Sequence, residues 1–91
     1  MAVSNTDYAA AYELLRTFLK RARDAKGLSQ AEVAAKLDVP QSYVSKYETG
    51  ERRLDLVETL DVLDALGEDA AAFIRKFRRA AAGERMSGRE R

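Results

Sequence analysis

The chain contains neither cysteine nor histidine. Without cysteine it can form no disulfide and no thiolate metal site. Without histidine it lacks the most common general base of enzymes and the most common metal ligand. Its carboxylates form no clustered constellation, and a small domain has little room for a substrate pocket. We therefore expect a protein that is not an enzyme and that holds no metal and no cofactor.

Long apolar runs and strand patterns are also missing. No stretch approaches the roughly 20 apolar residues that span a bilayer, and the N-terminus has no signal-peptide core. We therefore expect a cytoplasmic protein without a membrane partner. No segment alternates apolar and polar residues as a strand does, which predicts an all-α fold. The 91 residues form one small domain, and because such a domain buries only about 60–65% of its unfolded surface, a partner subunit would help its stability.

The charges are nearly balanced in number but are unevenly distributed. The formal net charge is +1. Residues 75–91 carry seven basic and two acidic side chains, a net of +5, whereas residues 54–70 carry six acidic side chains and no basic one. This segregation indicates a polarised molecule, in which the acidic segment would stay away from phosphate.

Apolar periodicity and capping residues predict five helices within a domain over residues 8–82. The first runs from 8 to 25, two short helices lie within 29–50, the fourth follows a cap at Asp55, and the fifth covers 69–82. Leu56, Leu60 and Leu63 are expected on the core face of the fourth helix. Residues 1–7 are expected to be flexible, and residues 83–91 a disordered basic tail.

Residues 28–50 read as two short helices joined by a tight turn. Ser29 and Glu32 have the spacing of a capping box, so the first helix starts at Ser29. Asp38 follows where that helix must end, and Pro40 can open the next one. Gly50 ends the second helix, where glycine adopts left-handed geometry at little cost. Helices this short need neighbours for stability, so the exposed polar residues of the second helix point to a purpose other than folding.

The fifth helix carries more apolar surface than four preceding helices require. Phe73, Ile74 and Phe77 must pack on Leu14 and Phe18, on a second subunit, or on both. We predict that these three residues form a dimer interface.

The stretch resembles the helix-turn-helix of Cro/repressor-type, XRE-like (lambda-repressor-like) DNA-binding proteins. The matching residues span roughly Leu19 to Gly67 and are Arg23, Gly27-Leu28-Ser29-Gln30, Val33-Ala34, Leu37, Val39, Val44-Ser45, Tyr47-Glu48 and Gly50. Two residues depart from the family pattern. Asp38 stands where the turn usually has glycine, although Asp tolerates left-handed geometry better than most residues. Pro40 replaces the usual Ser or Thr cap.

The resemblance implies specific roles for residues around the second helix. In this motif that helix lies in the major groove with its N-terminal residues at the base edges. Gln can pair with adenine and Lys with guanine. Base contacts are expected from Gln41, Ser42 and Lys46. Phosphate contacts are expected from Gln30, with Tyr43, Ser45, Arg52 and Arg53 as further candidates. Arg23 and Glu48 match positions that form an ion pair between the first and third helices.

The leading hypothesis is a sequence-specific regulator of transcription that binds double-stranded DNA as a homodimer on a palindromic operator. The alternative is a protein-interaction module, such as an antitoxin-like partner that masks another protein. The two hypotheses can both hold for one chain.

Overall fold

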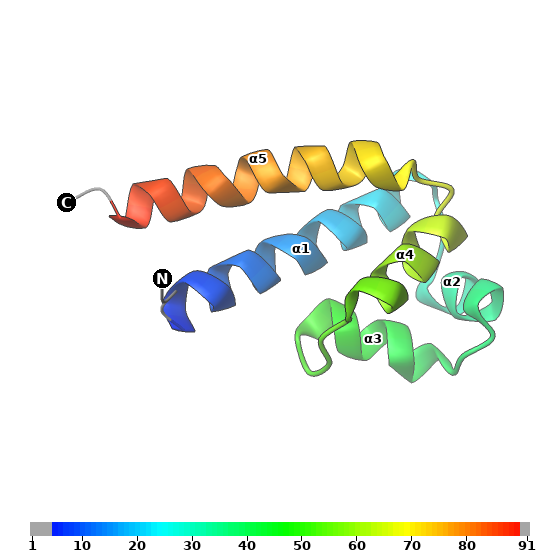
Figure 1. Cartoon of the computed structure of the whole chain (residues 1–91). Coiled ribbons are helices and arrows are strands. Elements are labelled where there is room, and N and C mark those ends of the chain that lie inside the picture. Colours follow the sequence, from blue (N-terminus) through cyan, green and yellow to red (C-terminus); the bar gives the residue numbers. More distant parts are fainter. Residues whose placement is uncertain (1–4, 90–91) are drawn as a thin grey trace.

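The computed structural model describes the backbone of residues 5–89 and the side chains of residues 8–83. Its five helices are α1 (Asn5–Ala25), α2 (Gln30–Leu37), α3 (Gln41–Thr49), α4 (Leu56–Ala65) and α5 (Ala70–Arg89). The described residues contain no strand, and the expected all-α, five-helix fold is confirmed. In Figure 1 the long helices α1 and α5 lie side by side, and the three short helices gather near one end of this pair.

Both outer helices extend beyond their predicted ends. α5 continues to Arg89, so the predicted end at residue 82 and the disordered tail from 83 are wrong for residues 83–89. Gly83 does not take the positive φ of a helix-ending glycine, and a glycine inside a helix costs only about 1 kcal/mol relative to alanine. α1 begins at Asn5, so residues 5–7 are helical rather than flexible. Residues 1–4 and 90–91, also predicted to be flexible, lie outside the described residues.

The core draws on all five helices. Its most buried apolar side chains are Leu19, Val33, Ala34, Val44, Tyr47, Val62, Leu63, Leu66 and Phe73. Burying one side chain of the size of valine or leucine stabilises the fold by about 1.5–3 kcal/mol. Because α2 and α3 each place buried residues in this core, their positions relative to α1 are fixed.

The core face of α4 differs from the predicted one. Leu56 is 67% exposed and Leu60 is 39% exposed, so placing them in the core was wrong, whereas Leu63 is fully buried as expected. The buried residues of this helix include Thr59, whose hydroxyl donates to the Asp55 carbonyl at 2.7 Å. Because that bond satisfies the hydroxyl, Thr59 can occupy the core position in the first turn that the sequence pattern gave to leucine.

The contact between α1 and α5 is built on phenylalanine. The rings of Phe73 and Phe77 both meet Phe18 edge-on, with centroids 6.1 Å apart. Such pairs contribute about 0.5–1.5 kcal/mol beyond their buried area. Phe73 is only 7% exposed within the single chain, so it packs on Phe18, one of the partners predicted for it, and offers little surface to a second subunit. Ile74 and Phe77 are half-buried and pack against the same core.

Candidate nucleic-acid interface

Helix α2 begins at a complete capping box. The backbone N–H of Glu32 donates to Ser29 Oγ at 3.0 Å, and the backbone N–H of Ser29 donates to Glu32 Oε1 at 2.7 Å. The hydrogen bonds from Ser29, the backbone one first, hold the pKa of Glu32 below its usual value. This box fixes the first turn of α2 and therefore the direction in which Gln30 projects.

The turn between α2 and α3 accommodates both departures from the family pattern. Asp38 adopts left-handed geometry with φ 60° and ψ 46°, and its N–H donates to the carbonyls of Ala34 and Ala35. This is the geometry that glycine usually supplies, and Asp is among the residues that tolerate it. Pro40 has φ −65° and provides no side-chain cap for α3. The turn therefore keeps its shape, and α3 starts with fewer satisfied N–H groups.

Helix α3 has one buried face and one polar face. Val44 and Tyr47 are buried in the core. Burial also raises the pKa of Tyr47 well above that of a free tyrosine. Gln41, Ser42 and Lys46 are exposed, and Tyr43 and Ser45 are half-buried. The structure thus brings the three predicted base-contacting residues together on the exposed side of one helix that the core holds in place.

A chain of polar contacts runs from α1 through α3 to this face. Arg23 Nε donates to Glu48 Oε2 at 2.7 Å, and a second guanidinium nitrogen donates to Glu48 Oε1 at 3.0 Å. Arg23 also donates to the Leu28 carbonyl at 2.8 Å. The ion pair that the resemblance implies is therefore present, two-pronged and shielded, with side chains 10% and 3% exposed. The hydrogen bond to Glu48 also raises the pKa of Arg23.

Glu48 has a further partner that sequence reasoning missed. Gln30 Nε2 donates to Glu48 Oε1 at 2.9 Å, and Gln41 Nε2 donates to Gln30 Oε1 at 3.4 Å. The carboxylate therefore turns the carbonyl end of the Gln30 amide toward Gln41. Because the two residues are 18 positions apart, local sequence patterns do not predict this contact. The sequence indicated it only in that Gln30 and Glu48 both match positions of the family pattern.

The loop after α3 holds the two candidate phosphate-binding arginines differently. Arg52 forms an ion pair with Glu58, and its guanidinium lies 4.5 Å from the centre of the Tyr43 ring. Arg53 is exposed, and its guanidinium lies 4.3 Å from the centre of the Tyr12 ring. Because Arg52 is already neutralised by a carboxylate, Arg53 is the more available of the two for phosphate.

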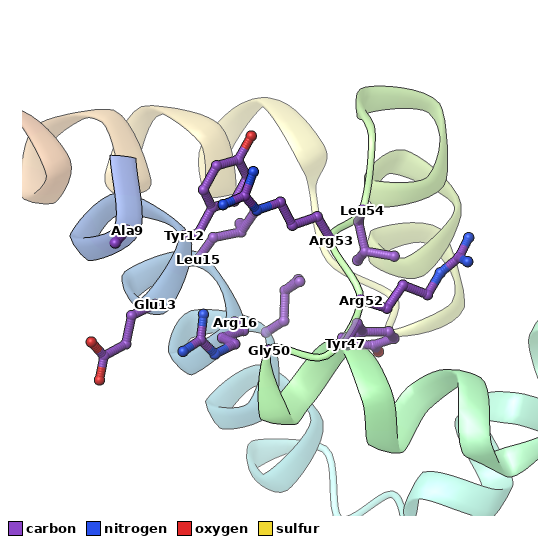
Figure 2. Close-up of a pocket in the computed structure, with 11 residues that line it drawn as sticks. Ala9, Tyr12, Glu13, Leu15, Arg16, Tyr47, Gly50, Arg52, Arg53 and Leu54 are labelled. Atoms are coloured by element: carbon purple, nitrogen blue, oxygen red, sulfur yellow. The ribbon is translucent and has the colours of Figure 1, made fainter. Parts of the chain in front are cut away.

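A cavity of about 220 Å³ lies between α1 and this loop (Figure 2). Its lining includes Tyr12 and Arg16 of α1, which sequence reasoning did not single out. The available signal was their spacing of four residues, which places both on one face of a helix.

None of the helices within residues 5–89 combines the length and the apolar composition that a membrane span requires.

Comparisons with known proteins agree with this geometry. A helix-turn-helix family model matches residues 19–73. The solved structure of an XRE-family like protein from Pseudomonas syringae pv. tomato str. DC3000 is 43% identical, with a TM-score of 0.80, over 82% of this chain and 92% of that one. Comparison with curated proteins finds no match.

Two solved structures of a restriction-modification controller protein share the fold at lower identity. Wild-type C.Esp1396I is 20% identical with a TM-score of 0.70, over 76% of this chain and 91% of that one. The C.Esp1396I tetramer in complex with its natural 35 base-pair operator is 19% identical with a TM-score of 0.72, over 79% of this chain and 95% of that one.

The fold and the exposed polar face of α3 define a helix-turn-helix protein of the class that binds DNA and regulates transcription. Within that class, the chain belongs to the XRE family.

Proposed function

We propose that the chain regulates transcription by binding a specific DNA sequence, with α3 in the major groove and Gln41, Ser42 and Lys46 at the base edges. The observation that carries this proposal is the exposed polar face of α3, whose opposite face is anchored in the core through Val44 and Tyr47. A reading helix must be both exposed and rigidly held, because a displaced side chain loses its match to the base pattern.

The hydrogen-bond chain through Glu48 prepares one of these side chains. Gln41 donates to Gln30, and Gln30 donates to the Glu48 carboxylate that Arg23 holds. A Gln41 amide restrained in this way loses less freedom when it meets adenine, where its amide can make a two-pronged contact. The phosphate contacts then come from Gln30, Tyr43, Ser45 and Arg53. Arg52 is a weaker phosphate contact, because its charge is shared with Glu58.

The regulator acts as a homodimer on a palindromic operator. Ile74 and Phe77 of α5 supply the interface, because they are the members of the predicted set that stay partly exposed. A two-fold dimer presents two copies of α3 about one helical turn of DNA apart, which matches a palindrome. A tetramer bound to its operator, as in the C.Esp1396I complex, offers a precedent in the same fold.

A protein-interaction role, such as that of an antitoxin-like partner, is the second candidate. Leu56, Val57 and Leu60 are exposed together on the first turns of α4. Adjacent exposed apolar side chains of this kind are typical of a surface that contacts another protein. This role does not exclude the first.

The test separates base reading from general attraction to DNA. Fluorescently labelled genomic fragments are titrated at two salt concentrations with the wild-type chain, Lys46→Ala and the matched control Lys36→Ala. Lys36 is exposed on α2 beside Asp61 and Asp64 of α4, away from the reading face. We expect Lys46→Ala to reduce discrimination between fragments and Lys36→Ala to retain it. Equal discrimination by all three proteins would contradict the role of α3.

A further inference from the structure

The cavity between α1 and the loop after α3 has an apolar floor and a basic rim. Leu15, Leu19, Tyr47 and Leu54 line the floor. At the rim, α1 contributes Arg16 and the loop contributes Arg53, whose guanidinium stacks on Tyr12 of α1. Two residues that are 37 positions apart in the chain, Arg16 and Arg53, therefore line the same cavity (Figure 2).

Gly50 determines where the charge of Arg16 lies. A side-chain carbon added to Gly50 would come within 2.9 Å of the central carbon of the Arg16 guanidinium. The absent side chain therefore lets the guanidinium lie directly over the backbone at the end of α3. Gly50 also has φ 89°, which strains any other residue.

Arg16 and Arg53 form no ion pair with any residue whose side chain the structure describes. Neither donates a side-chain hydrogen bond to these residues, although Arg16 also borders a second hollow that Asp24 and Glu48 line. Glu13 is the acidic residue of the lining, and Figure 2 shows its carboxylate pointing away from the cavity. Arg52 also lines the cavity, but its head group is engaged by Glu58 and Tyr43. Two available guanidinium groups at one opening form a site for an anion.

We propose that Arg16 and Arg53 bind one backbone phosphate of DNA, on the strand that borders the major groove at the C-terminal end of α3. This inference rests on the proposed function. The nine residues of α3 span about 13 Å at 1.5 Å per residue, and the major groove is about 12 Å wide. When the N-terminal residues of α3 read bases, the far end of the helix therefore reaches the bordering phosphates, where Arg16 and Arg53 lie.

The two arginines have complementary roles in this clamp. The Tyr12 ring restrains Arg53, and the end of α3 restrains Arg16, so both donors are positioned before DNA arrives. Planar guanidinium groups suit phosphate because each can donate two parallel hydrogen bonds. The clamp makes α1 part of the DNA interface and adds affinity without adding sequence preference.

The test measures the salt dependence of binding to a labelled 24-base-pair duplex of random sequence. Arg16→Gln, Arg53→Gln and the double variant are compared with Arg21→Gln, an exposed arginine of α1 that is not part of the lining of this cavity. Loss of one phosphate contact lowers the magnitude of the slope of log K against log salt by about 0.9. The gain in affinity when the salt concentration falls from 1 M to 0.1 M is then about eightfold smaller for the variant than for the wild-type chain. We expect this change in each clamp variant and a wild-type slope in Arg21→Gln.

The double variant tests whether one phosphate is shared. We expect its slope to fall by about one unit in total, whereas two separate phosphates would give about two. Arg16→Lys keeps a positive charge in place and should keep most of the slope. Thermal melting of each variant in the absence of DNA verifies that the fold is intact.

Three results would overturn the clamp. A wild-type slope in Arg16→Gln, with DNA binding intact and Lys46→Ala still losing discrimination, would refute the clamp and leave the proposed function standing. In the second result, inorganic phosphate raises the melting temperature of the wild-type chain but not that of Arg16→Gln, and the variant keeps the wild-type salt slope. This would assign the site to a free anion instead of a DNA phosphate. No binding of the wild-type chain to any duplex at 50 mM salt would refute the proposed function and the clamp with it.

Discussion

Removing the Glu48 carboxylate should destabilise the chain severely. In Glu48→Ala, the Arg23 guanidinium loses both hydrogen bonds to the carboxylate and stays in a site where its side chain is 10% exposed. Gln30 loses its acceptor as well. Breaking a buried pair on one side costs about 3–5 kcal/mol. Domains of this size have a total stability of about 5–15 kcal/mol, so the loss is a large fraction of it.

The assay is thermal unfolding followed by circular dichroism. For a domain of 60–100 residues, 1 kcal/mol shifts Tm by about 4–8 °C, so Glu48→Ala should lower Tm by at least 12 °C. The matched control is Glu51→Ala, which removes an exposed carboxylate three residues further on. A surface change of that kind stays within about 0.5 kcal/mol.

A double variant separates the cost of an unpaired charge from the value of the pair. Replacing both partners with apolar residues, Arg23→Met with Glu48→Leu, leaves no charge without a partner and should recover at least half of the lost stability. If Glu48→Ala and Glu51→Ala lower Tm by the same small amount, the reasoning about the shielded pair is refuted.

The remaining predictions concern the interface, the dimer and the capping box. Arg53→Ala should weaken binding to operator and random DNA alike, as measured by fluorescence anisotropy, because phosphate contacts carry no sequence information. Phe77→Glu should shift sedimentation at high micromolar concentration from dimer to monomer, and a wild-type chain that sediments as a monomer there would rule out the interface. Glu32→Gln should flatten the fall in stability at acidic pH. Its pKa lies below the usual 4.5 in the folded chain, so its contribution is complete above that value and is lost as pH falls through the lowered pKa.

The features that sequence predicted well are local. The capping boxes at Ser29 and Asp55 involve residues three positions apart, so the sequence alone specifies their geometry. The left-handed turn at Asp38 follows from a short segment in the same way. The polar face of α3 was predictable because its two buried residues follow helical spacing.

The features that sequence missed depend on which neighbour a residue meets. Leu56 is as apolar as Leu63, but only the second reaches the core, because α4 presents Thr59 inward in its first turn. The engagement of Arg52 by Glu58 and the place of Arg16 over Gly50 likewise require the folded arrangement of two elements. The continuation of α5 through Gly83 was missed because glycine more often ends a helix than continues one.

The most direct test of the account is selection of binding sites from a random duplex library by the wild-type chain and by Gln41→Ala. We expect the wild-type chain to enrich a palindromic site. We expect Gln41→Ala to lose preference at one symmetric pair of positions while its salt slope stays unchanged, since a two-pronged base contact contributes about 1–3 kcal/mol of discrimination at one base pair. An identical enriched site for both proteins, or no enriched site for the wild-type chain, would contradict the claim that α3 reads the sequence.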